Sequence, residues 1–246
     1  MNTLTTVNDT IEKYEKFINP SLARLFRLMG LSTIEWEAAG NIITDIEGKK
    51  YIDCLGGYGV FSRGHKHPKV VAAVKEQLEL MPLSGKILFD KPTADLAALL
   101  AEITPGDLQY SFFGNSGAEA VEGAMKLARL HTNRPKIIAT TNAFHGKTLG
   151  ALSATGRDMF RDPFKPLLPG VIHVPFGDIA ELSQAIDQET AAVIVEPIQG
   201  EGGIIIPPDD YLGAVRRLCD ENKVLMICDE VQTGLGRTGL NFITNH

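Results

Sequence analysis

The sequence feature that most constrains the fold is a run of five apolar residues, 224–228, which is followed at once by Asp229. An unbroken apolar run of this length is typical of a central strand in a parallel sheet, because helices cover both faces of such a strand. Ligands of these sheets bind at the carboxyl ends of the strands, which is where Asp229 would lie. A single aspartate after a strand is equally well explained as a turn residue, so the rest of the chain has to decide.

Four further strand-like runs precede this one and alternate with helix-like segments. The expected strands cover residues 110–113, 136–140, 171–174, 192–195 and 224–228, and the expected helices cover residues 118–131, 179–186 and 211–222. A loop rich in glycine and proline follows the second of these strands. Alternating strands and helices with short links predict an α/β domain built on a mostly parallel sheet.

Helices and one hairpin are expected before this alternation begins. Apolar residues recur at steps of three and four over residues 10–29, which predicts two short amphipathic helices around Pro20 that end at Gly30. Two β-rich runs within residues 41–55 flank Gly48, which predicts a hairpin with an exposed tip.

Two more amphipathic helices are expected over residues 67–80 and 90–103. The first begins beside a proline, which is tolerated at a helix start because its missing N–H would have no partner there. The apolar faces are Val70, Val71, Val74 and Leu78 in the first helix and the inward-facing Leu96, Leu99 and Leu100 in the second.

Composition and charge exclude several classes of protein. The 246 residues are 44% hydrophobic and 22% charged, as in ordinary globular proteins, which argues against a disordered or fibrous chain. The formal net charge of -6 gives no basic surface for nucleic acid or an anionic membrane. Three cysteines without zinc-ligand spacing argue against a disulfide framework or a structural metal, and they fit a reducing cytoplasm. We expect neither a signal peptide nor a membrane anchor, since no run approaches the ~20 apolar residues of a membrane helix.

Polar or glycine-rich groups follow four of the expected strands. They are residues 114–117, residues 142–146, Glu196 and Asp229. Because the carboxyl ends of parallel strands lie on one edge of a sheet, we expect these four groups to meet there. The sequence therefore predicts one candidate site at that edge.

The segment Ser116-Gly117-Ala118-Glu119 allows two interpretations. It fits a capping box, in which Ser116 and Glu119 satisfy N–H groups at the start of a helix. It also fits an anion cup, because the N–H groups of Ser116, Gly117 and Ala118 and the helix dipole attract negative charge and the glycine allows close approach. The two interpretations are compatible, and the residues alone do not choose between them.

Two apparent nucleotide-binding motifs are rejected. Residues 146–148 read Gly-Lys-Thr, like the end of a P-loop, but that motif needs a glycine five residues before the Gly-Lys pair, where Thr141 stands. Residues 234–239 match the letters of a dinucleotide fingerprint, yet they begin several residues after the strand and no helix pattern follows them.

A phosphate cup and a lone carboxylate together suit a phosphorylated pyridine ring. Asp229 would pair with the ring nitrogen and keep it protonated, so that the ring acts as an electron sink. Phe144 or His145 would cover one face of the ring, and Val231 would cover the other. Taken alone, Phe144 is as well explained as an ordinary core aromatic.

Counted together, the motifs resemble the class III (ω-amino acid) family of pyridoxal 5'-phosphate-dependent aminotransferases, of fold type I. The similarity covers nearly the whole chain, and residues 53–57, 110–113 and 173–177 are also shared with the putrescine aminotransferase group of this family. The motifs that carry the resemblance lie at residues 54–59, 112–120, 143–156, 196–203 and 229–239.

The resemblance implies a role for each site residue. Gly117 and Ala118 would hold the phosphate beside Ser116, although Ala118 stands where many members have threonine. Asp229 would pair with the pyridinium nitrogen. The other implied roles are Phe144 stacked on the ring with His145 beside it, Val231 beneath the ring, Gln232 at the phenolic oxygen, Glu196 as a supporting acid behind the ring and Glu201 near the substrate channel.

The family also implies a reaction, a partner arrangement and a missing residue. We expect transfer of an amino group from a diamine or ω-amino acid, putrescine above all, to a 2-oxo acid, in a cytoplasmic homodimer. Acetylornithine, ornithine or 4-aminobutyrate as donor is the alternative, and racemases and aminomutases share these motifs. Members carry a Schiff-base lysine downstream of the Asp229 motif, and none of residues 230–246 is a lysine.

The absence of that lysine leads to three expectations. The chain is expected to be truncated within the large domain and inactive by itself. Residues 1–55 are expected to be an N-terminal segment that packs with a missing small domain, and residues 56–246 the N-terminal part of the large domain that binds the cofactor. A sheet without its neighbouring strands exposes apolar edges, so we expect poor solubility of the isolated chain.

Overall fold

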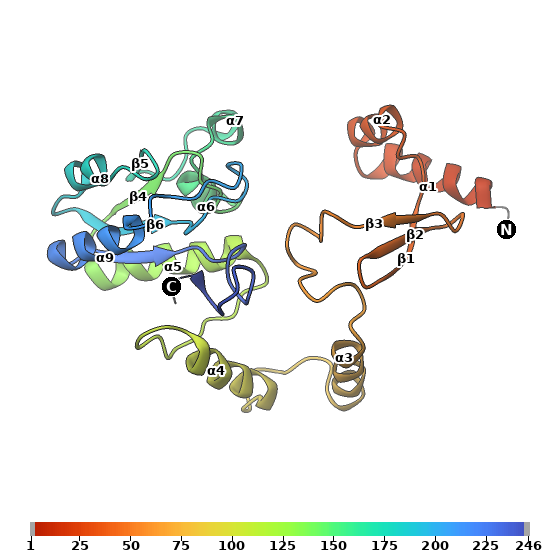
Figure 1. Ribbon diagram of the computed structural model, residues 1–246, viewed down its shortest axis with the longest axis horizontal. Helices are drawn as coiled ribbons and strands as arrows, with labels where there is room; N and C mark the ends of the chain where they lie inside the picture. Colours follow the sequence, from red (N-terminus) through yellow and green to blue (C-terminus); the bar gives the residue numbers. More distant parts are fainter. Residues whose placement is uncertain (1–2, 244–246) are drawn as a thin grey trace. The chain divides into compact units, whose positions relative to one another are not determined.

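The chain forms two compact units, and the boundary between them in the sequence lies between Leu88 and Phe89. The computed structural model describes residues 3–243, and Figure 1 shows their helices and strands. The sequence-based domain division after residue 55 stays a prediction, and residues 56–88 group with the first unit. Among the described residues, no helix is both long enough and apolar enough to span a bilayer.

The first unit begins with the two helices that the sequence predicts around Pro20. They are α1 (Thr3–Phe17) and α2 (Pro20–Leu28), and α1 begins earlier than expected. The side chain of Asn19 starts α2 by accepting hydrogen bonds from the N–H groups of Ser21 at 2.9 Å and Leu22 at 3.1 Å. Pro20 takes the first helical position, where no N–H is needed.

A three-stranded antiparallel sheet follows and confirms the predicted hairpin. Its strands are β1 (Glu35–Ala39), β2 (Ile42–Asp45) and β3 (Lys50–Ile52), in that order. Asp45 organises the turn, since its carboxylate accepts from the N–H of Lys49 at 2.9 Å and from the hydroxyl of Tyr51 at 2.9 Å. Burial raises the pKa of Asp45, but these hydrogen bonds outweigh it and hold the pKa below its usual value.

The first unit ends with the predicted helix α3 (Pro68–Leu80). The apolar side chains of Val70, Val74 and Leu78 are each more than half exposed. Few side chains of the first unit are buried. Among its described residues, Val7 and Ala23 are the buried apolar residues.

The second unit begins with α4 (Lys91–Ile103), which Asp90 caps by accepting from the N–H of Thr93 at 3.1 Å. The prediction that Leu96 and Leu99 face inward is wrong, because their side chains are 46% and 52% exposed. The helical spacing identified the apolar face correctly, but no described element packs extensively against it.

A four-stranded parallel sheet in the order β5-β4-β6-β7 forms the centre of the second unit. All six residues of β6 are buried, as expected for a strand that helices cover on both faces. The strands are β4 (Lys136–Thr140), β5 (Val171–Val174), β6 (Thr190–Val195) and β7 (Leu225–Cys228). These four predicted strands are confirmed.

Helices cover both faces of this sheet (Figure 1). One core cluster joins α5 (Gly117–Thr132) and α6 (Leu149–Ala154) to one face. The other joins α8 (Ile179–Ala185) and α9 (Tyr211–Asn222) to the opposite face. The sheet is thereby fixed between two layers, and the polar residues that follow its strands are held at its edge.

Two details of the second unit differ from the prediction. Residues 110–113 form no strand, because a strand needs a hydrogen-bonded neighbour and none of the described strands pairs with them. The glycine- and proline-rich loop after β4 contains two short helices that the sequence did not indicate, α6 and α7 (Asp158–Arg161), and the 3₁₀ turn η1 (Asp162–Phe164).

Candidate active site

The carboxyl ends of β6 and β7 place two acids side by side. Val195 and Cys228 are register partners at the ends of these strands, and Glu196 and Asp229 follow them directly. The N–H of Asp229 donates to the carbonyl of Val195 at 2.8 Å, which continues the ladder by one residue. The prediction that these strand ends share one edge is confirmed.

Asp229 lies against His145, which comes from the loop after β4. The distance from His145 Nδ1 to Asp229 Oδ2 is 2.7 Å, and the two side chains are 0% and 6% exposed. The other oxygen, Oδ1, accepts from the N–H of Val231 at 3.1 Å. The structure thus places His145 beside the carboxylate rather than at the position of a stacked ring, and both Asp229 oxygens are held.

Glu196 is the second buried acid of the site, and only 5% of it is exposed. Its Oε2 accepts from the N–H of Phe144 at 2.8 Å, and its Oε1 accepts from the N–H of Gly200 at 3.2 Å. Burial raises the pKa of Glu196, the two N–H groups lower it in part, and the negative charge of Asp229 raises it further. Glu196 thereby links the loops that follow β4 and β6.

The start of α5 supplies the polar backbone groups of the site. Ser116 caps the helix by accepting from the N–H of Glu119 at 3.2 Å, and the Glu119 carboxylate accepts from the N–H of Asn115 at 2.5 Å. In a standard capping box the Glu119 carboxylate would accept from the N–H of Ser116, whereas here it accepts from the N–H of the preceding residue, Asn115. The N–H groups of Gly117 and Ala118 have no partner within the helix, so both interpretations of this segment remain compatible.

Three glycines, which have no side chain, allow the segments of the site to pack closely together. A Cβ on Gly117 would lie 2.9 Å from Cγ2 of Val231, and a Cβ on Gly146 would lie 2.7 Å from Cβ of Ala118. In the same way a Cβ on Gly200 would lie 2.5 Å from Oε1 of Gln232. The start of α5, the loop after β4 and the segment after β7 therefore meet at the carboxyl edge of the sheet.

An aromatic pair with two cations lies beside these segments. The rings of Phe144 and Phe160 meet edge to face with centroids 6.1 Å apart. Nζ of Lys147 lies 5.1 Å from the Phe160 centroid and 5.8 Å from the Phe144 centroid, and the Arg157 guanidinium lies 4.9 Å from the Phe160 centroid. The sequence analysis missed Phe160 and Arg157. The only signal for Lys147 was the Gly-Lys-Thr segment that was rejected as a P-loop.

The remaining predicted residues lie in the loops around this centre. The carbonyl of Glu201 accepts from Nη1 of Arg157 at 2.8 Å. Gln199, which the sequence analysis did not single out, is fully buried, and its Nε2 donates to Oγ1 of Thr140 at 3.1 Å and to the carbonyl of Thr141 at 2.8 Å. Its position inside the motif at residues 196–203 was the available signal. Gln199 fastens the loop after β6 to the end of β4.

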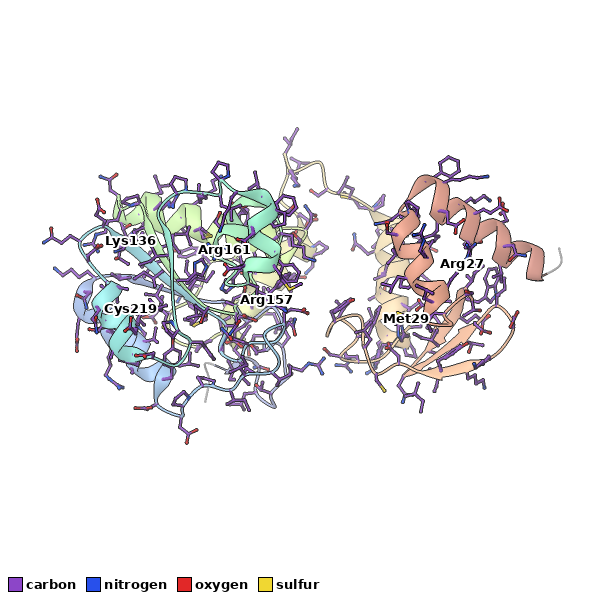
Figure 2. All side chains as sticks on the ribbon, turned by 90° about the horizontal axis from the view of Figure 1, so that it is seen from above. Arg27, Met29, Lys136, Arg157, Arg161 and Cys219 are labelled. Atoms are coloured by element: carbon purple, nitrogen blue, oxygen red, sulfur yellow. The ribbon has the colours of Figure 1, made fainter. Side chains whose placement is uncertain are left out.

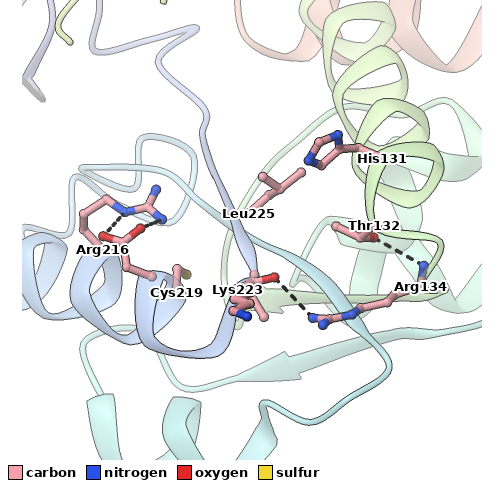
Figure 3. A pocket seen from close by; sticks show the side chains of 9 residues that line it. His131, Thr132, Arg134, Arg216, Cys219, Lys223 and Leu225 are labelled. Atoms are coloured by element: carbon pink, nitrogen blue, oxygen red, sulfur yellow. Dashed lines mark hydrogen bonds and ion pairs between the residues drawn. The ribbon is translucent and has the colours of Figure 1, made fainter. Parts of the chain in front are cut away.

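A pocket of about 360 Å³ lies at the opposite, amino edge of the sheet (Figure 3). Nη1 of Arg134 donates to the carbonyls of Thr190 at 3.1 Å and Lys223 at 3.2 Å, and Arg216 forms an ion pair with Asp220 at 2.6 Å. Arg134, Arg216 and Asp220 are therefore engaged in contacts within the protein, and the predicted site residues lie at the other edge.

Comparison with known families identifies this arrangement. The family described as "Aminotransferase class-III" matches residues 30–246. The chain belongs to the class III aminotransferases. Its parallel sheet with flanking helices is part of the large domain of fold type I, as the sequence predicted. Members of the class III aminotransferases use pyridoxal 5'-phosphate as their cofactor.

Solved structures of other class III aminotransferases are similar to the chain. An (S)-enantioselective ω-transaminase from Thermomicrobium roseum is 33% identical with a TM-score of 0.87, over 98% of this chain and 60% of the enzyme. The ornithine aminotransferase of Toxoplasma gondii is 32% identical with a TM-score of 0.82, over 92% and 57%. A taurine:2-oxoglutarate aminotransferase from Bifidobacterium kashiwanohense, solved with pyridoxal phosphate and glutamate, is 33% identical with a TM-score of 0.80, over 85% and 53%. The chain thus spans between 53% and 60% of the length of these enzymes.

The residues at the carboxyl edge fit the cofactor of this family. Gly117 packs closely against Val231 and Gly146 against Ala118, beside N–H groups whose position at a helix start favours a phosphate. Asp229 offers a carboxylate that is oriented by two hydrogen bonds, as a pyridine nitrogen requires. Phe144 is half-buried at the same edge and offers an aromatic face.

Proposed function

We propose that the protein transfers an amino group from a diamine, with putrescine as the favoured donor, to a 2-oxo acid. The observation that carries the proposal is the meeting of Asp229, His145 and the start of α5 at one sheet edge. Family membership supports the reaction class, and the sequence segments shared with putrescine aminotransferases support the donor. The acceptor is inferred from the taurine:2-oxoglutarate enzyme among the similar structures.

The cofactor supplies an electron-withdrawing ring, which is the chemistry that labilises the bond next to the amino nitrogen. The chain's residues bind and orient that ring. Asp229 pairs with the ring nitrogen and keeps its proton in place, because a carboxylate stabilises a neighbouring cation. The N–H groups of Gly117 and Ala118, together with Ser116, hold the phosphate at the positive end of α5.

The other site residues enclose the ring. Phe144 would cover one face of the ring and Val231 the other, since Val231 is exposed beside Gly117. Gln232 would donate to the phenolic oxygen. Glu196 would support the ring through the loop that carries Phe144, and Glu201 would lie near the substrate.

A second donor class is favoured by a specific observation. One of the similar structures is an ornithine aminotransferase. Ornithine, acetylornithine and 4-aminobutyrate each carry a carboxylate that putrescine lacks. The cations Lys147, beside Phe144, and Arg157, beside Phe160, would pair with that carboxylate.

We also propose that the active protein is a homodimer. The exposed Leu127 and Leu130 on α5, 64% and 81% exposed, are suitable contact residues.

Two measurements test the proposed function. A form of the protein that carries the Schiff-base lysine of the family is incubated with pyridoxal phosphate and 2-oxoglutarate, and glutamate formation is compared with putrescine, ornithine and 4-aminobutyrate as donors. We expect the highest kcat/KM with putrescine, and a preference for ornithine or 4-aminobutyrate would replace the donor assignment. Binding of pyridoxamine 5'-phosphate to the 246-residue chain is then measured by calorimetry, and the absence of binding would contradict the site itself.

For the 246-residue chain by itself, we propose cofactor binding without turnover. The reason is that residues 224–246 contain no lysine. The chain is incubated with pyridoxal phosphate, reduced with borohydride and examined by mass spectrometry. A single modified lysine together with glutamate formation would contradict this proposal.

A further inference from the structure

We propose that Glu122 is a positioning residue, which holds the segment after the Phe144 loop against α5 and thereby sets where the Phe144 ring lies relative to the phosphate cup. The inference rests on the proposed function, because it takes Phe144 as the residue that covers the cofactor ring and the N–H groups of Gly117 and Ala118 as the groups that hold the phosphate. It adds a residue that acts on the ring only through the loop that carries Phe144.

One oxygen of Glu122 accepts three hydrogen bonds from the start of α6. Oε1 accepts from the hydroxyl of Thr148 at 2.7 Å, from the N–H of Gly150 at 2.9 Å and from the N–H of Ala151 at 3.2 Å. The N–H groups of a first helical turn have no partner within their own helix. Thr148 is the N-cap residue of α6, but its side chain makes no capping hydrogen bond. Glu122 therefore caps α6 from a different helix.

Gly150 allows the Glu122 carboxylate to come this close. A Cβ on Gly150 would lie 2.7 Å from Oε1 of Glu122 and would approach Oε2 even more closely. A side chain at residue 150 would therefore displace the carboxylate. The glycine and the glutamate form one contact, although they are 28 residues apart in sequence and belong to two helices.

Glu122 also lies on the face of α5 that already contacts the Phe144 loop. It follows Ala118 by four residues, so the two side chains share one face of the helix. A Cβ on Gly146 would lie 2.7 Å from Cβ of Ala118, which shows that the loop packs against this face. Two successive turns of α5 thus contact residues 146–151, and the first of them carries the N–H groups of the phosphate cup.

The other side of the loop is fixed independently of α5. The N–H of Gly156 donates to the carbonyl of Ala143 at 2.8 Å, and the N–H of Phe144 donates to Oε2 of Glu196 at 2.8 Å. Loss of Glu122 would therefore release the loop only on the side that faces α5. The ring of Phe144 would move relative to the phosphate cup while the sheet stays in place.

The test measures binding of pyridoxamine 5'-phosphate to the 246-residue chain by calorimetry and the circular dichroism of the bound ligand in its own absorption band. Glu122→Leu removes the acceptor, and Glu122→Gln keeps an oxygen that can accept the same hydrogen bonds. Gly150→Ala displaces the carboxylate from the opposite side, although alanine is the better helix former. Thermal unfolding of each variant checks its fold.

Two control variants make the same changes on α9. Glu221→Leu replaces an exposed glutamate of that helix. Gly213→Ala fills a helical position where a Cβ would lie 3.4 Å from Nη1 of Arg217, an ordinary contact distance. Neither control should change the affinity for pyridoxamine phosphate.

We expect Glu122→Leu and Gly150→Ala each to weaken binding by about tenfold, the lower end of the loss found when the supporting partner of a metal ligand is removed. Glu122→Gln should bind as the wild type does. At saturation, the circular dichroism of the bound ligand should be smaller in Glu122→Leu, because the ring is no longer held in one orientation. In a Phe144→Ala background, Glu122→Leu should weaken binding by less than about twofold, since the residue it positions is gone.

Three results would overturn the inference. If Glu122→Leu binds as the wild type does, Glu122 has no part in the site. If the effects of Glu122→Leu and Phe144→Ala are additive, or if Glu122→Gln binds no better than Glu122→Leu, Glu122 only stabilises the fold. If Glu122→Leu does not fold, the same comparison with Phe144→Ala is made with Gly150→Ala. Failure of the proposed function gives a different pattern, in which the wild-type chain does not bind pyridoxamine phosphate or binds it equally well after Phe144→Ala alone.

Discussion

The two edges of the four-stranded sheet both carry polar side chains, but these side chains make different contacts. At the amino edge, Arg134 is bound to backbone carbonyls and Lys136 pairs with Asp187 at 2.5 Å. At the carboxyl edge, the first N–H groups of α5 have no partner within the helix, and we propose that they and Asp229 bind a ligand. In Figure 2, Lys136 and Cys219 lie at one end of the second unit, and Arg157 and Arg161 lie toward the other. A pocket alone therefore does not identify the site, because Arg134, Arg216 and Asp220 at the amino edge are engaged in contacts within the protein.

The largest expected effect comes from Asp229→Ala at the carboxyl edge. It removes the proposed partner of the ring nitrogen and leaves His145 without its acceptor. Binding of pyridoxamine phosphate should fall by about 100-fold, the loss expected for a hydrogen bond to a charged group. Calorimetry checks this, with Asp220→Ala at the amino edge as the matched control. Equal affinities of the two variants would remove the distinction between the edges.

Arg134→Leu should affect folding stability but not ligand binding. Its guanidinium bonds to the carbonyls of Thr190 and Lys223 are lost, so we expect the free energy of unfolding to fall by about 2 kcal/mol. Urea denaturation measures the change, and calorimetry should show unchanged affinity for pyridoxamine phosphate. A stable variant with weakened binding would show that the amino edge takes part in the site.

Gly117→Ala tests the close approach at the start of α5. The new Cβ would meet Val231 at 2.9 Å and displace it or the helix start. We expect about tenfold weaker binding, equivalent to ~1.4 kcal/mol. Gly123→Ala on the same helix is the control, where a Cβ would lie 3.2 Å from the ring of Phe112, away from the site. Equal effects of the two substitutions on binding would contradict the phosphate cup.

The smallest effect expected is a change in the pH dependence of stability. Because the pKa of Glu196 is raised above its usual value of 4.5, the folded chain holds this proton more tightly than the unfolded chain does. Its contribution to stability is therefore greatest below pH 4.5 and decreases as the pH rises through the raised pKa. Glu196→Gln removes this slope. Thermal melts should show the wild type losing stability relative to the variant between pH 4.5 and neutral pH, and parallel curves would be evidence against it.

The sequence predicted the parts of the fold that depend on local pattern. Apolar runs within β4, β6 and β7 indicated strands of a parallel sheet, and the rule for strand ends brought Glu196 and Asp229 together correctly. Residues 110–113 are three aromatic residues and a serine and form no strand, since pairing depends on a neighbour that the pattern of one segment cannot supply.

The contacts of the site that sequence did not predict depend on the paths of loops. The pairing of His145 with Asp229 requires the loop after β4 to approach the end of β7, and the sequence does not show this path. Phe144 and His145 are neighbours in the sequence, and sequence alone does not show which of their rings would face a ligand. Lys147 and Arg157 contact the ring of Phe160 because helices α6 and α7 form in a segment that the sequence analysis expected to be a loop. Helical spacing alone also could not show that Leu96 and Leu99 lack a covering element.

The central claim is that Asp229 pairs with a protonated pyridine nitrogen at the carboxyl edge of the sheet. Nitrogen-15 NMR of ring-labelled pyridoxamine 5'-phosphate bound to the chain measures the protonation state of that nitrogen directly. We predict a protonated nitrogen in the wild-type complex at neutral and mildly alkaline pH, and its loss in the Asp229→Asn complex. An unprotonated nitrogen in the wild-type complex, or the same signal in both complexes, would contradict the claim.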